Sequence, residues 1–393
     1  MAKTRGGSTR WVSVGRSADS DAGGAGAAAA REAIGTRADA KLLVVFCSDT
    51  YDLAALLTSV NEFSGGVPLI GCSTAGEIAT AGPSDSSLVI LAFGGSGFTV
   101  ATGAGTATGN GLRQASVDAV EACRGAIEEG EHRMVVLLTD GLGGDQMEVV
   151  RGAYSVVGAE VPLVGGCAGD NLKMKRTYQL FGDQVLQESV VAAAVSSDAP
   201  IGIGVRHGWR KVGDAMLVSS SGASKVYTLN DRPALDEYLR RLDAPEAAHH
   251  DADAFTRFAM THPLGISRRS GAEVRFVAGA DFDERSLVCI AQVPQGGLAW
   301  MMEGDDDSVL EATDLACSDA LSQIDGPPIA LVAFDCIARK GVLGDQGIQK
   351  EIDRIAGYAD GAPVAGFYTY GEIARTKGMS GFHNQTLVVL AVG

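Results

Sequence analysis

The sequence lacks the features that mark membrane, secreted and nucleic-acid-binding proteins. No apolar run reaches the roughly 18 residues of a membrane-spanning helix, and the basic start "MAKTRGGSTR" leads into no apolar signal core. Only 32 Lys and Arg stand against 48 Asp and Glu, which argues against a polyanion as partner because binding one needs a basic face. We therefore expect a cytoplasmic protein that binds neither a membrane nor nucleic acid.

Cysteine pairs and the common cofactor motifs are missing as well. The seven cysteines include no Cys-x-x-Cys pair, which predicts reduced thiols and neither disulfides nor a zinc site. There is no Gly-Lys-Ser/Thr phosphate loop, no Gly-x-Ser-x-Gly elbow and no His-Glu-x-x-His motif. His249 and His250 lie in a polar segment without a matching ligand pair, which favours a solvated surface over a metal site. From these patterns we expect no metal and no cofactor.

One glycine-rich stretch, "GAGTATG" from Gly103, imitates a dinucleotide-binding fingerprint. Its third glycine comes one place late, and no strand ending in an acid follows about 20 residues later. We therefore interpret the stretch as a glycine-rich loop between two parts of a repeated unit.

What the sequence does contain is one phrase written three times. The versions are "VPLIGCSTAGEI" from Val67, "VPLVGGCAGDN" from Val161 and "APVAGFYTYGEI" from Ala362. Each follows a helical interval and an unbroken apolar run, as expected of strands covered on both faces. With 393 residues, of which 46% are hydrophobic, the chain is long enough for two domains or one duplicated unit.

These patterns predict an α/β fold. The repeated unit runs strand, helix, strand, Gly-acid loop, strand, which favours duplicated strand-helix-strand units in two related mixed-sheet halves covered by helices. The loops at Gly71, Gly165 and Gly366 are expected at equivalent strand ends. The first nine or so residues are expected to be flexible.

The acid that follows the loop glycine is the first candidate for binding. Glu77 and Glu372 hold this place in the first and third copies, and Asp170 holds the related place in the second. A carboxylate in a crevice at strand ends costs free energy unless a cation or several donors face it. We therefore predict that these acids orient a cationic or hydrogen-bond-donating group of a small ligand.

The rival explanation is an internal ion pair. Arg339 is the candidate partner, since it follows Asp335 at the end of the neighbouring strand. The predicted ligand-binding set joins the loops to these polar neighbours. Its members are Cys72, Ser73, Thr74, Gly76, Glu77, Gly166, Asp170, Asn171, Asp335, Arg339, Tyr370, Gly371, Glu372, His383 and Asn384.

Two histidines leave alternatives open. His383 and Asn384 precede the last strand, and His207 lies two residues before Trp209. An imidazole in such a place serves as a recognition group, a proton shuttle or a haem ligand, and the simpler alternative is an exposed histidine beside a turn-capping asparagine.

A thiol-dependent enzyme is a further alternative, because several cysteines fall at or just past strand ends. A nucleophilic thiol needs a lowered pKa. No cysteine has a histidine at a recurrent offset, and the third copy replaces Cys72 and Ser73 by Phe367 and Tyr368. We therefore expect no catalytic residue and no enzymatic activity.

These phrases, in this order, resemble the FIST family over nearly the whole chain. "LLVVFCSDTYD", "VPLIGCSTAGEI", "VPLVGGCAGDN" and "IGVRHGWRKVG" are similar to its N-terminal domain, and "VAFDCIARKGVLG", "GFYTYGEIARTKG" and "FHNQTLVVLAV" to its C-terminal domain. The resemblance implies an intracellular sensory module of bacterial signal transduction that binds small ligands, with amino acids among the proposals. Some relatives resemble haem-bound nitric oxide sensors, which gives His207 and His383 a second meaning.

The resemblance also suggests a division of the chain. We expect a flexible start over residues 1–9, an N-terminal FIST domain over 10–230 and a C-terminal FIST domain over 231–393. No kinase, cyclase or chemoreceptor sequence follows "VVLAVG", so we expect any signal to pass to a separate effector protein.

Overall fold

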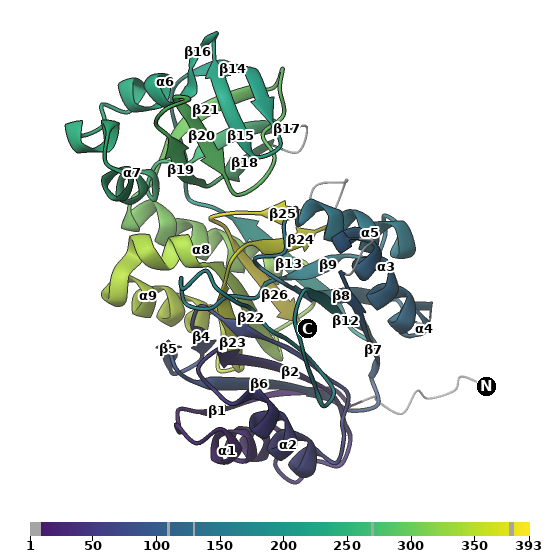
Figure 1. Cartoon of the computed structure of the whole chain (residues 1–393). Helices are drawn as coiled ribbons and strands as arrows, with labels where there is room; N and C mark the ends of the chain where they lie inside the picture. The colour runs from purple at the N-terminus through teal and green to yellow at the C-terminus, as the bar shows by residue number, and fades with distance from the viewer. Residues whose placement is uncertain (1–8, 108–110, 129, 269–270, 377–380) are drawn as a thin grey trace.

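The computed structural model describes residues 9–107, 111–128, 130–268, 271–376 and 381–393. It shows a body of three sheets with helices outside and a smaller domain on top (Figure 1). The α/β class predicted from the sequence is confirmed. The expected flexible start falls, apart from Thr9, outside the described residues.

The body consists of three related units rather than two halves. The first contains β1 (Trp11–Ser17), α1 (Ala22–Ile34), β2 (Ala40–Ser48), α2 (Leu53–Ser64), β3 (Leu69–Thr74), β4 (Glu77–Ala79), β5 (Gly82–Ser84) and β6 (Leu88–Gly94). The second contains β7 (Phe98–Thr106), α3 (Gly111–Cys123), α4 (Gly125–Glu128), β8 (His132–Thr139), α5 (Met147–Val157), β9 (Leu163–Cys167), β10 (Gln179–Phe181), β11 (Gln184–Leu186) and β12 (Ser189–Ser197). All three copies of the repeated phrase therefore have a unit of their own.

The third unit is interrupted by the smaller domain. It contains β13 (Ile201–Arg206), α8 (Asp306–Leu321), β22 (Ala330–Cys336), α9 (Ile337–Ala359), β23 (Val364–Thr369), β24 (Glu372–Arg375), β25 (Phe382–His383) and β26 (Leu387–Val392). The inserted domain contains β14 (Arg210–Gly222), β15 (Lys225–Leu229), β16 (Arg232–Pro233), α6 (Ala234–Arg241), η1 (Glu246–His249), α7 (Ala252–Ala259), β17 (Leu264–Arg268), β18 (Gly271–Arg275), β19 (Val277–Asp281), β20 (Ser286–Cys289) and β21 (Leu298–Glu303). The domain boundary predicted at residue 230 falls inside this inserted domain, between β15 and β16.

The three sheets of the body share one strand order. They run β1-β6-β2-β3-β10-β11, β7-β12-β8-β9-β24-β25 and β13-β26-β22-β23-β4-β5. In each sheet the two central strands are parallel, as a strand-helix-strand crossover requires. The outer hairpin of each sheet belongs to a unit other than the one that supplies the first four strands. Each unit therefore contributes a hairpin to the sheet of one neighbour and receives a hairpin from the other neighbour.

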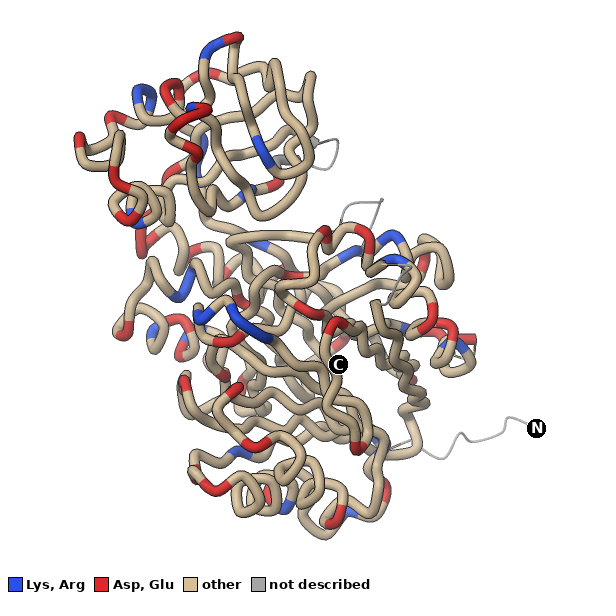
Figure 2. Tube along the Cα trace, viewed as in Figure 1, with Lys and Arg blue, Asp and Glu red and all other residues tan. Residues whose placement is uncertain are grey.

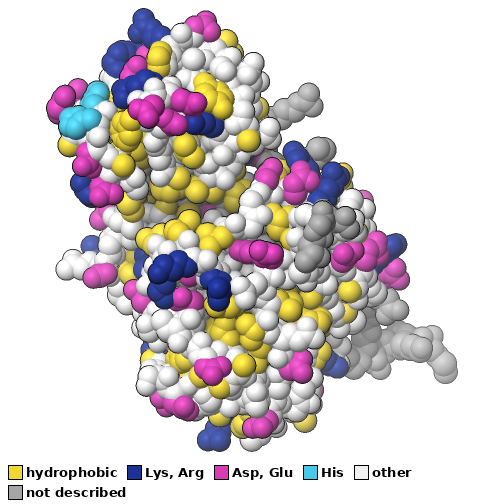
Figure 3. Space-filling view, in the orientation of Figure 1, with side chains coloured by type: hydrophobic (Ala, Val, Ile, Leu, Met, Phe, Trp, Pro, Cys, Tyr) yellow, Lys and Arg dark blue, Asp and Glu magenta, His cyan; other side chains and the backbone are white. Residues whose placement is uncertain are grey.

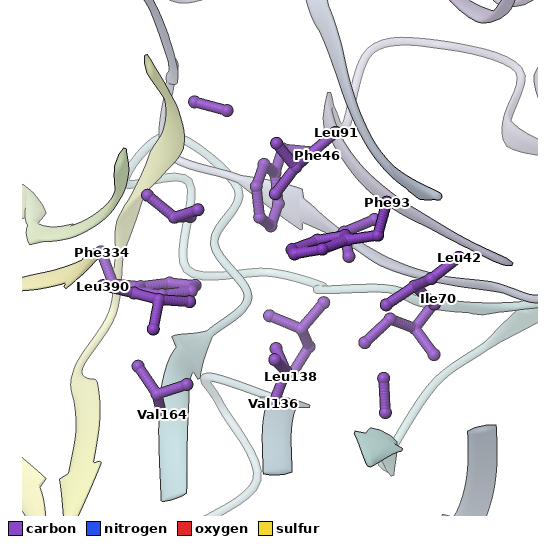
Figure 4. Close-up of a cluster of buried hydrophobic side chains, with 14 of the residues drawn as sticks. Leu42, Phe46, Ile70, Leu91, Phe93, Val136, Leu138, Val164, Phe334 and Leu390 are labelled. Carbon is purple, nitrogen blue, oxygen red and sulfur yellow. The ribbon is translucent and has the colours of Figure 1, made fainter. Parts of the chain in front are cut away.

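The sheets enclose a single apolar core between their inner faces. Figure 4 shows side chains from all three sheets meeting there, among them Phe46, Leu138 and Phe334. Phe46 stacks on Phe367 with the ring centroids 4.8 Å apart, and Phe334 meets Phe367 edge to face. The outer faces pack against α1 and α2, against α3 and α5, and against α8 and α9. Figure 2 shows charged residues mainly on the helices and loops outside these sheets.

Glycines let each outer helix lie close to a strand. A Cβ at Gly15, Gly103 or Gly204 would lie 2.0, 2.1 or 1.9 Å from a helix carbonyl oxygen, far inside van der Waals contact. Within "GAGTATG", Gly103 and Gly105 lie in strand β7 and are required by its packing against α3, and the last two residues of the stretch lie outside the described part of the chain. The expectation of a loop over Gly103 was wrong.

Candidate functional site

The three repeated loops meet at one end of the body. The central registers pair Val45 with Gly71, Leu137 with Gly165 and Ala333 with Gly366, which confirms that the loops occupy equivalent strand ends. A Cβ on any of these glycines would lie 2.5 Å or less from the carbonyl oxygen of its partner. The loop glycines are thus required by the close approach of the parallel strands.

Main-chain hydrogen bonds close these loops into a ring. Gly169 N donates to Ser73 O at 3.0 Å, and Tyr368 N donates to Gly76 O at 2.8 Å. Cys167 N donates to Gly371 O at 2.8 Å and completes the circle. The loops are therefore held by one another, with no group between them needed to bring them together.

Glu77 and Glu372 have matching partners inside the protein. Glu77 Oε1 accepts from Thr74 Oγ1 at 2.5 Å, and Oε2 accepts from the amide and hydroxyl of Ser87 at 2.9 and 2.7 Å. Glu372 accepts in the same way from Thr369 and from the amide and hydroxyl of Thr386. Each acid ties its loop to the start of the following strand, so the repeated Gly-Glu phrase has a structural explanation.

The equivalent position in the second unit is Gln179, not Asp170. Gln179 pairs with Cys72 as the first residue of its hairpin, which is the place of Glu77 and Glu372 in theirs. Its Oε1 accepts from Ser189 N at 3.2 Å. Glutamine fills the same position, so the position itself does not require a negative charge.

Asp170 has a different role, which corrects the expected equivalence. It accepts hydrogen bonds from the amides of Met174, Lys175 and Arg176 and from the Tyr370 hydroxyl. Burial would raise the pKa of Asp170, but these bonds outweigh burial and lower its pKa. Asp170 therefore anchors a surface loop that only the second unit has.

Burial strongly affects the two loop glutamates. It raises the pKa of Glu77 and of Glu372 to about 7, although the hydroxyl and amide donors act in the opposite direction. Both side chains are at most 1% exposed, and neither lines a described cavity. The ligand-orienting role of Glu77 and Glu372 stays a prediction. Neither side chain reaches solvent through a described cavity.

Arg339 forms the internal ion pair that the sequence offered as an alternative. Its Nε donates to Asp335 Oδ1 at 2.7 Å, and its Nη2 donates to Glu351 at 2.5 Å. Burial, and next the Glu351 carboxylate, raise the pKa of Asp335. Arg339 and Glu351 of α9 thus form a fully buried network with Asp335 of β22.

The cysteines show no activation. All seven are free and buried, and burial raises the pKa of each thiol, to about 11 for Cys123 and about 12 for Cys167. A thiol nucleophile needs the opposite shift. Cys72, Ser73 and Thr74 are likewise buried, and Ser73 Oγ is committed to Gly169 O.

A cavity lies where the inserted domain meets the body. Its volume is about 670 Å³, and its walls come from the end of β13, the connection to β14, β18 of the inserted domain, α8, and the region of β24 and β25. Charged side chains of both signs, Arg206, Arg210, Glu273 and Glu311, lie along it. Of the residues predicted for ligand binding, only His383 lines this cavity.

Two neutral imidazoles face the cavity. Trp209 N donates to His207 Nδ1 at 3.0 Å, so this nitrogen is the acceptor and Nε2 carries the hydrogen. His383 Nε2 faces the carbonyl of Ala374 at 2.9 Å, so Nε2 is the donor and Nδ1 keeps its lone pair. Burial lowers the pKa of both rings, that of His207 to about 4. One ring therefore offers a donor and the other an acceptor.

Asn384 and Tyr370 face a second, smaller hollow of about 100 Å³. Asn384 is 2% exposed, and its Oδ1 has no hydrogen-bond partner among the described residues. Asn171, in contrast, lies exposed on the loop after Asp170. Gly166 and Gly371 are strand-end glycines in the ring and line neither hollow.

Two family models match this chain in succession. Residues 41–232 match the FIST N domain, and residues 234–375 match the FIST C domain. The chain is a FIST-domain protein. Together the matches cover most of the FIST protein described here and confirm the family that its phrases resembled.

This FIST protein shows distant similarity to one curated protein and to two solved structures. An uncharacterised protein of Methanocaldococcus jannaschii is 24% identical over 160 residues, which are 38% of this chain and 31% of the relative. Two solved cyanuric acid hydrolases are each 12% identical. The one from A. caulinodans has a TM-score of 0.29, covering 49% of this chain and 72% of that chain. The other has a TM-score of 0.35, covering 98% and 100%.

Most cavity residues were missed by the sequence analysis. Arg206, Glu273 and Leu315 stand in three distant segments and share no motif. The one local signal was the "VRHGWR" stretch, where His207 and Trp209 follow a strand. That stretch is the connection to the inserted domain, and it lines the cavity.

Proposed function

We propose that this FIST protein is a cytoplasmic sensory protein that binds a small metabolite, an amino acid or a compound of similar size, and signals through a separate effector protein. The observation that carries the proposal is the cavity of about 670 Å³ between the inserted domain and the body. Its volume lies within the range of small-molecule sites. Sites of this kind often form between domains, where a ligand can change their relative position.

The polar groups of the cavity suit a ligand with both charges. Arg206 and Arg210 pair with Asp319 and Asp305 at the surface, where such pairs are weak and exchangeable. They can therefore attract a carboxylate. Glu273 of the inserted domain is already paired with Arg275 at 2.8 Å, so the exposed Glu311 of α8 is the carboxylate that favours an ammonium group. The two imidazoles add one donor and one acceptor, which supports a zwitterion such as an amino acid.

Glu372 acts on this site through another residue. Thr386 lines the cavity and donates its hydroxyl to Glu372 Oε2. Glu372 is therefore proposed as a positioning residue for Thr386, while Glu77, which does not line this cavity, is proposed as part of the scaffold. Binding is favoured over catalysis because no activated thiol is present among the seven cysteines.

A thermal-shift screen against amino acids and related metabolites would find the ligand, because binding to the folded state raises the unfolding midpoint. Leu315 then tests the site: it lines the cavity and is 47% exposed, so Leu315→Arg should fold normally. We expect at least a tenfold loss of affinity by calorimetry. Leu217→Arg is the matched control, since Leu217 is 42% exposed and lines no described cavity.

Equal affinity in both variants would overturn the proposed site. A Soret band in the purified protein would instead favour the haem alternative. The geometry restricts that alternative, because His383 Nδ1 has a lone pair to give to iron, whereas the His207 nitrogens are engaged or protonated. Loss of the band in His383→Gln, and not in His207→Gln, would then be expected.

A further inference from the structure

The second unit carries a loop that the other two units lack. In units one and three, the acid that begins the next hairpin comes three residues after the threonine that ends the strand. These pairs are Thr74 with Glu77 and Thr369 with Glu372. In the second unit residues 168–178 separate β9 from β10. Residues 171–176 of this connection, called here the 171–176 loop, have no counterpart in the repeat.

The loop is held rigidly in an unfavourable conformation. Leu172 and Met174 have φ values of 62° and 52°, which are costly for a leucine or a methionine, and they follow Asn171 at 51°. Four hydrogen bonds to Asp170 maintain this shape, and the Tyr370 hydroxyl accepts from Leu172 N at 2.6 Å. The result is a fixed loop rather than a random connection.

The loop displays apolar side chains to solvent. Leu172 is 59% exposed and Met174 57%, the two highest values among the exposed large hydrophobic residues of the described chain. Both line the hollow of about 100 Å³, together with Phe276 and Ile290 of the inserted domain. Figure 3 shows hydrophobic side chains gathered along this edge of the inserted domain, with Lys and Arg side chains below them on the body.

The buried Asn384 Oδ1 is a second, independent sign of a ligand. It lines the same hollow and lacks a hydrogen-bond donor among the described residues. Unpartnered buried acceptors are costly and rare in native proteins. A peptide N–H entering the hollow would satisfy it.

The other side of the loop is basic. Lys175 and Arg176 line an adjacent cleft of about 440 Å³, and neither has an ion-pair partner within the described part of the chain. Asp140 and Glu188 also line the cleft, but Asp140 Oδ1 already accepts from Leu142 N and from the Thr177 hydroxyl. In a protein of net charge −16, two adjacent cations without partners favour an acidic occupant.

We infer that the 171–176 loop is the docking site for an acidic peptide segment of a partner protein, which inserts one aliphatic side chain into the smaller hollow and places carboxylates beside Lys175 and Arg176. The hollow has the volume of one such side chain, and its open walls would leave a free small molecule largely in water. The net negative charge of the protein disfavours an anionic membrane as occupant. The inference stands independently of the ligand cavity.

Selection of a random 12-residue peptide display library on the full chain tests it. We expect enrichment of peptides with an aliphatic residue among Asp and Glu. A fluorescein-labelled selected peptide then serves as the anisotropy probe. The double variant Leu172→Asn with Met174→Asn should bind it at least tenfold more weakly, and should fold normally because asparagine tolerates positive φ.

Arg176→Glu should also weaken binding at least tenfold and reduce its dependence on salt. Leu298→Asn is the matched control, since Leu298 is 45% exposed and lines neither hollow, and it should bind as the parent does. Failure to enrich such peptides, or equal binding by all variants, would overturn the inference. Binding to phosphatidylglycerol vesicles that the same variants abolish, without any selected peptide, would assign the surface to a membrane instead.

Discussion

At the scale of single residues, the repeated acid is best understood by comparing its three copies. Glu77 and Glu372 each accept three hydrogen bonds from residues of their own unit. Gln179 keeps the bond to the amide that starts the next strand. What the position needs is an acceptor at a fixed place, and the carboxylate charge is a cost of burial rather than a requirement.

Replacing these acids by the amide of the second unit should remove a pH dependence of stability. The pKa of each is about 7 in the folded protein and 4.5 as its ordinary value, so the folded state holds the proton more tightly. Their stabilising contribution is complete below pH 4.5 and is lost as the pH rises to 7. Glu77→Gln and Glu372→Gln should therefore gain stability relative to the parent between pH 5 and 8.

The expected gain is about 1.4 kcal/mol for each unit of pKa shift that is removed. Urea unfolding of parent and variants at pH 5 and pH 8 measures it, with the exposed Glu62→Gln as the control for residue type. A stability difference that is constant across this pH range would show that the two carboxyls are not protonated by burial. An affinity loss in Glu77→Gln with unchanged stability would restore the ligand role predicted from the sequence.

The chemistry of single residues was only partly predictable from the sequence. The Arg339 and Asp335 pair was offered as the rival explanation, because Arg339 follows Asp335 at the end of an apolar strand, and the structure contains this pair. Glu351, which completes the network, lies 12 residues after Arg339, and no local sequence pattern indicates their contact. Asp170 was misjudged because residues 171–178 separate it from Gln179, the true equivalent of the acid.

At the scale of elements, close pairing of the central parallel strands determines where glycine stands. A Cβ on Gly366 would lie 1.9 Å from the Ala333 carbonyl oxygen. Gly366→Ala should therefore force β22 and β23 apart and lower the free energy of unfolding by about 3 kcal/mol or more. The φ of Gly366, 159°, adds to the steric cost, because residues with a Cβ rarely adopt it.

Gly357→Ala is the matched control. Gly357 lies within helix α9, and a Cβ there meets nothing within 4 Å. This change should raise stability by about 0.5–1 kcal/mol, because alanine is the better helix former. Urea unfolding at one pH compares the two variants. Equal stability of Gly366→Ala and the parent would show that the strands can separate freely.

Strands, helices and the phrase that joins them were predictable because their signals are local. Unbroken apolar runs marked β2, β8 and β22, and glycines marked the ends of the repeated loops. The exchange of hairpins was not predictable, because β4, β10 and β24 pair with strands of other units. Such pairings depend on the packing of remote segments, and the strands concerned are only three or four residues long.

At the scale of the whole molecule, two neighbouring chain segments join the inserted domain to the body, one after β13 and one before α8. Its first and last strands pair through Arg210 and Glu303, and Trp209 packs on Gly304 at the crossing. The insertion separates β13 from α8, and for this reason the third unit could not be recognised as complete from its sequence. The ligand cavity forms along the seam that the insertion creates, and no local pattern indicates it.

Deleting the inserted domain should leave a folded body. Because Arg210 and Glu303 are neighbours across two strands, a Gly-Ser-Gly link can replace residues 211–302 without stretching the chain. We expect one cooperative thermal transition of the remaining body, followed by circular dichroism and calorimetry, and no binding of the cavity ligand. Loss of cooperative unfolding would show that the two parts fold as one unit.

The exchanged hairpins also affect how this protein is made. On the ribosome, hairpin β4–β5 is complete at Ser84, but the strand that it pairs with, β23, begins only at Val364. The first sheet likewise waits for β10 and β11 from the second unit. A nascent chain thus carries unpaired strand edges until β23 has been synthesised. A chain that terminates before this strand cannot complete the ring of sheets, and its open edges make it a natural target for chaperones and proteases.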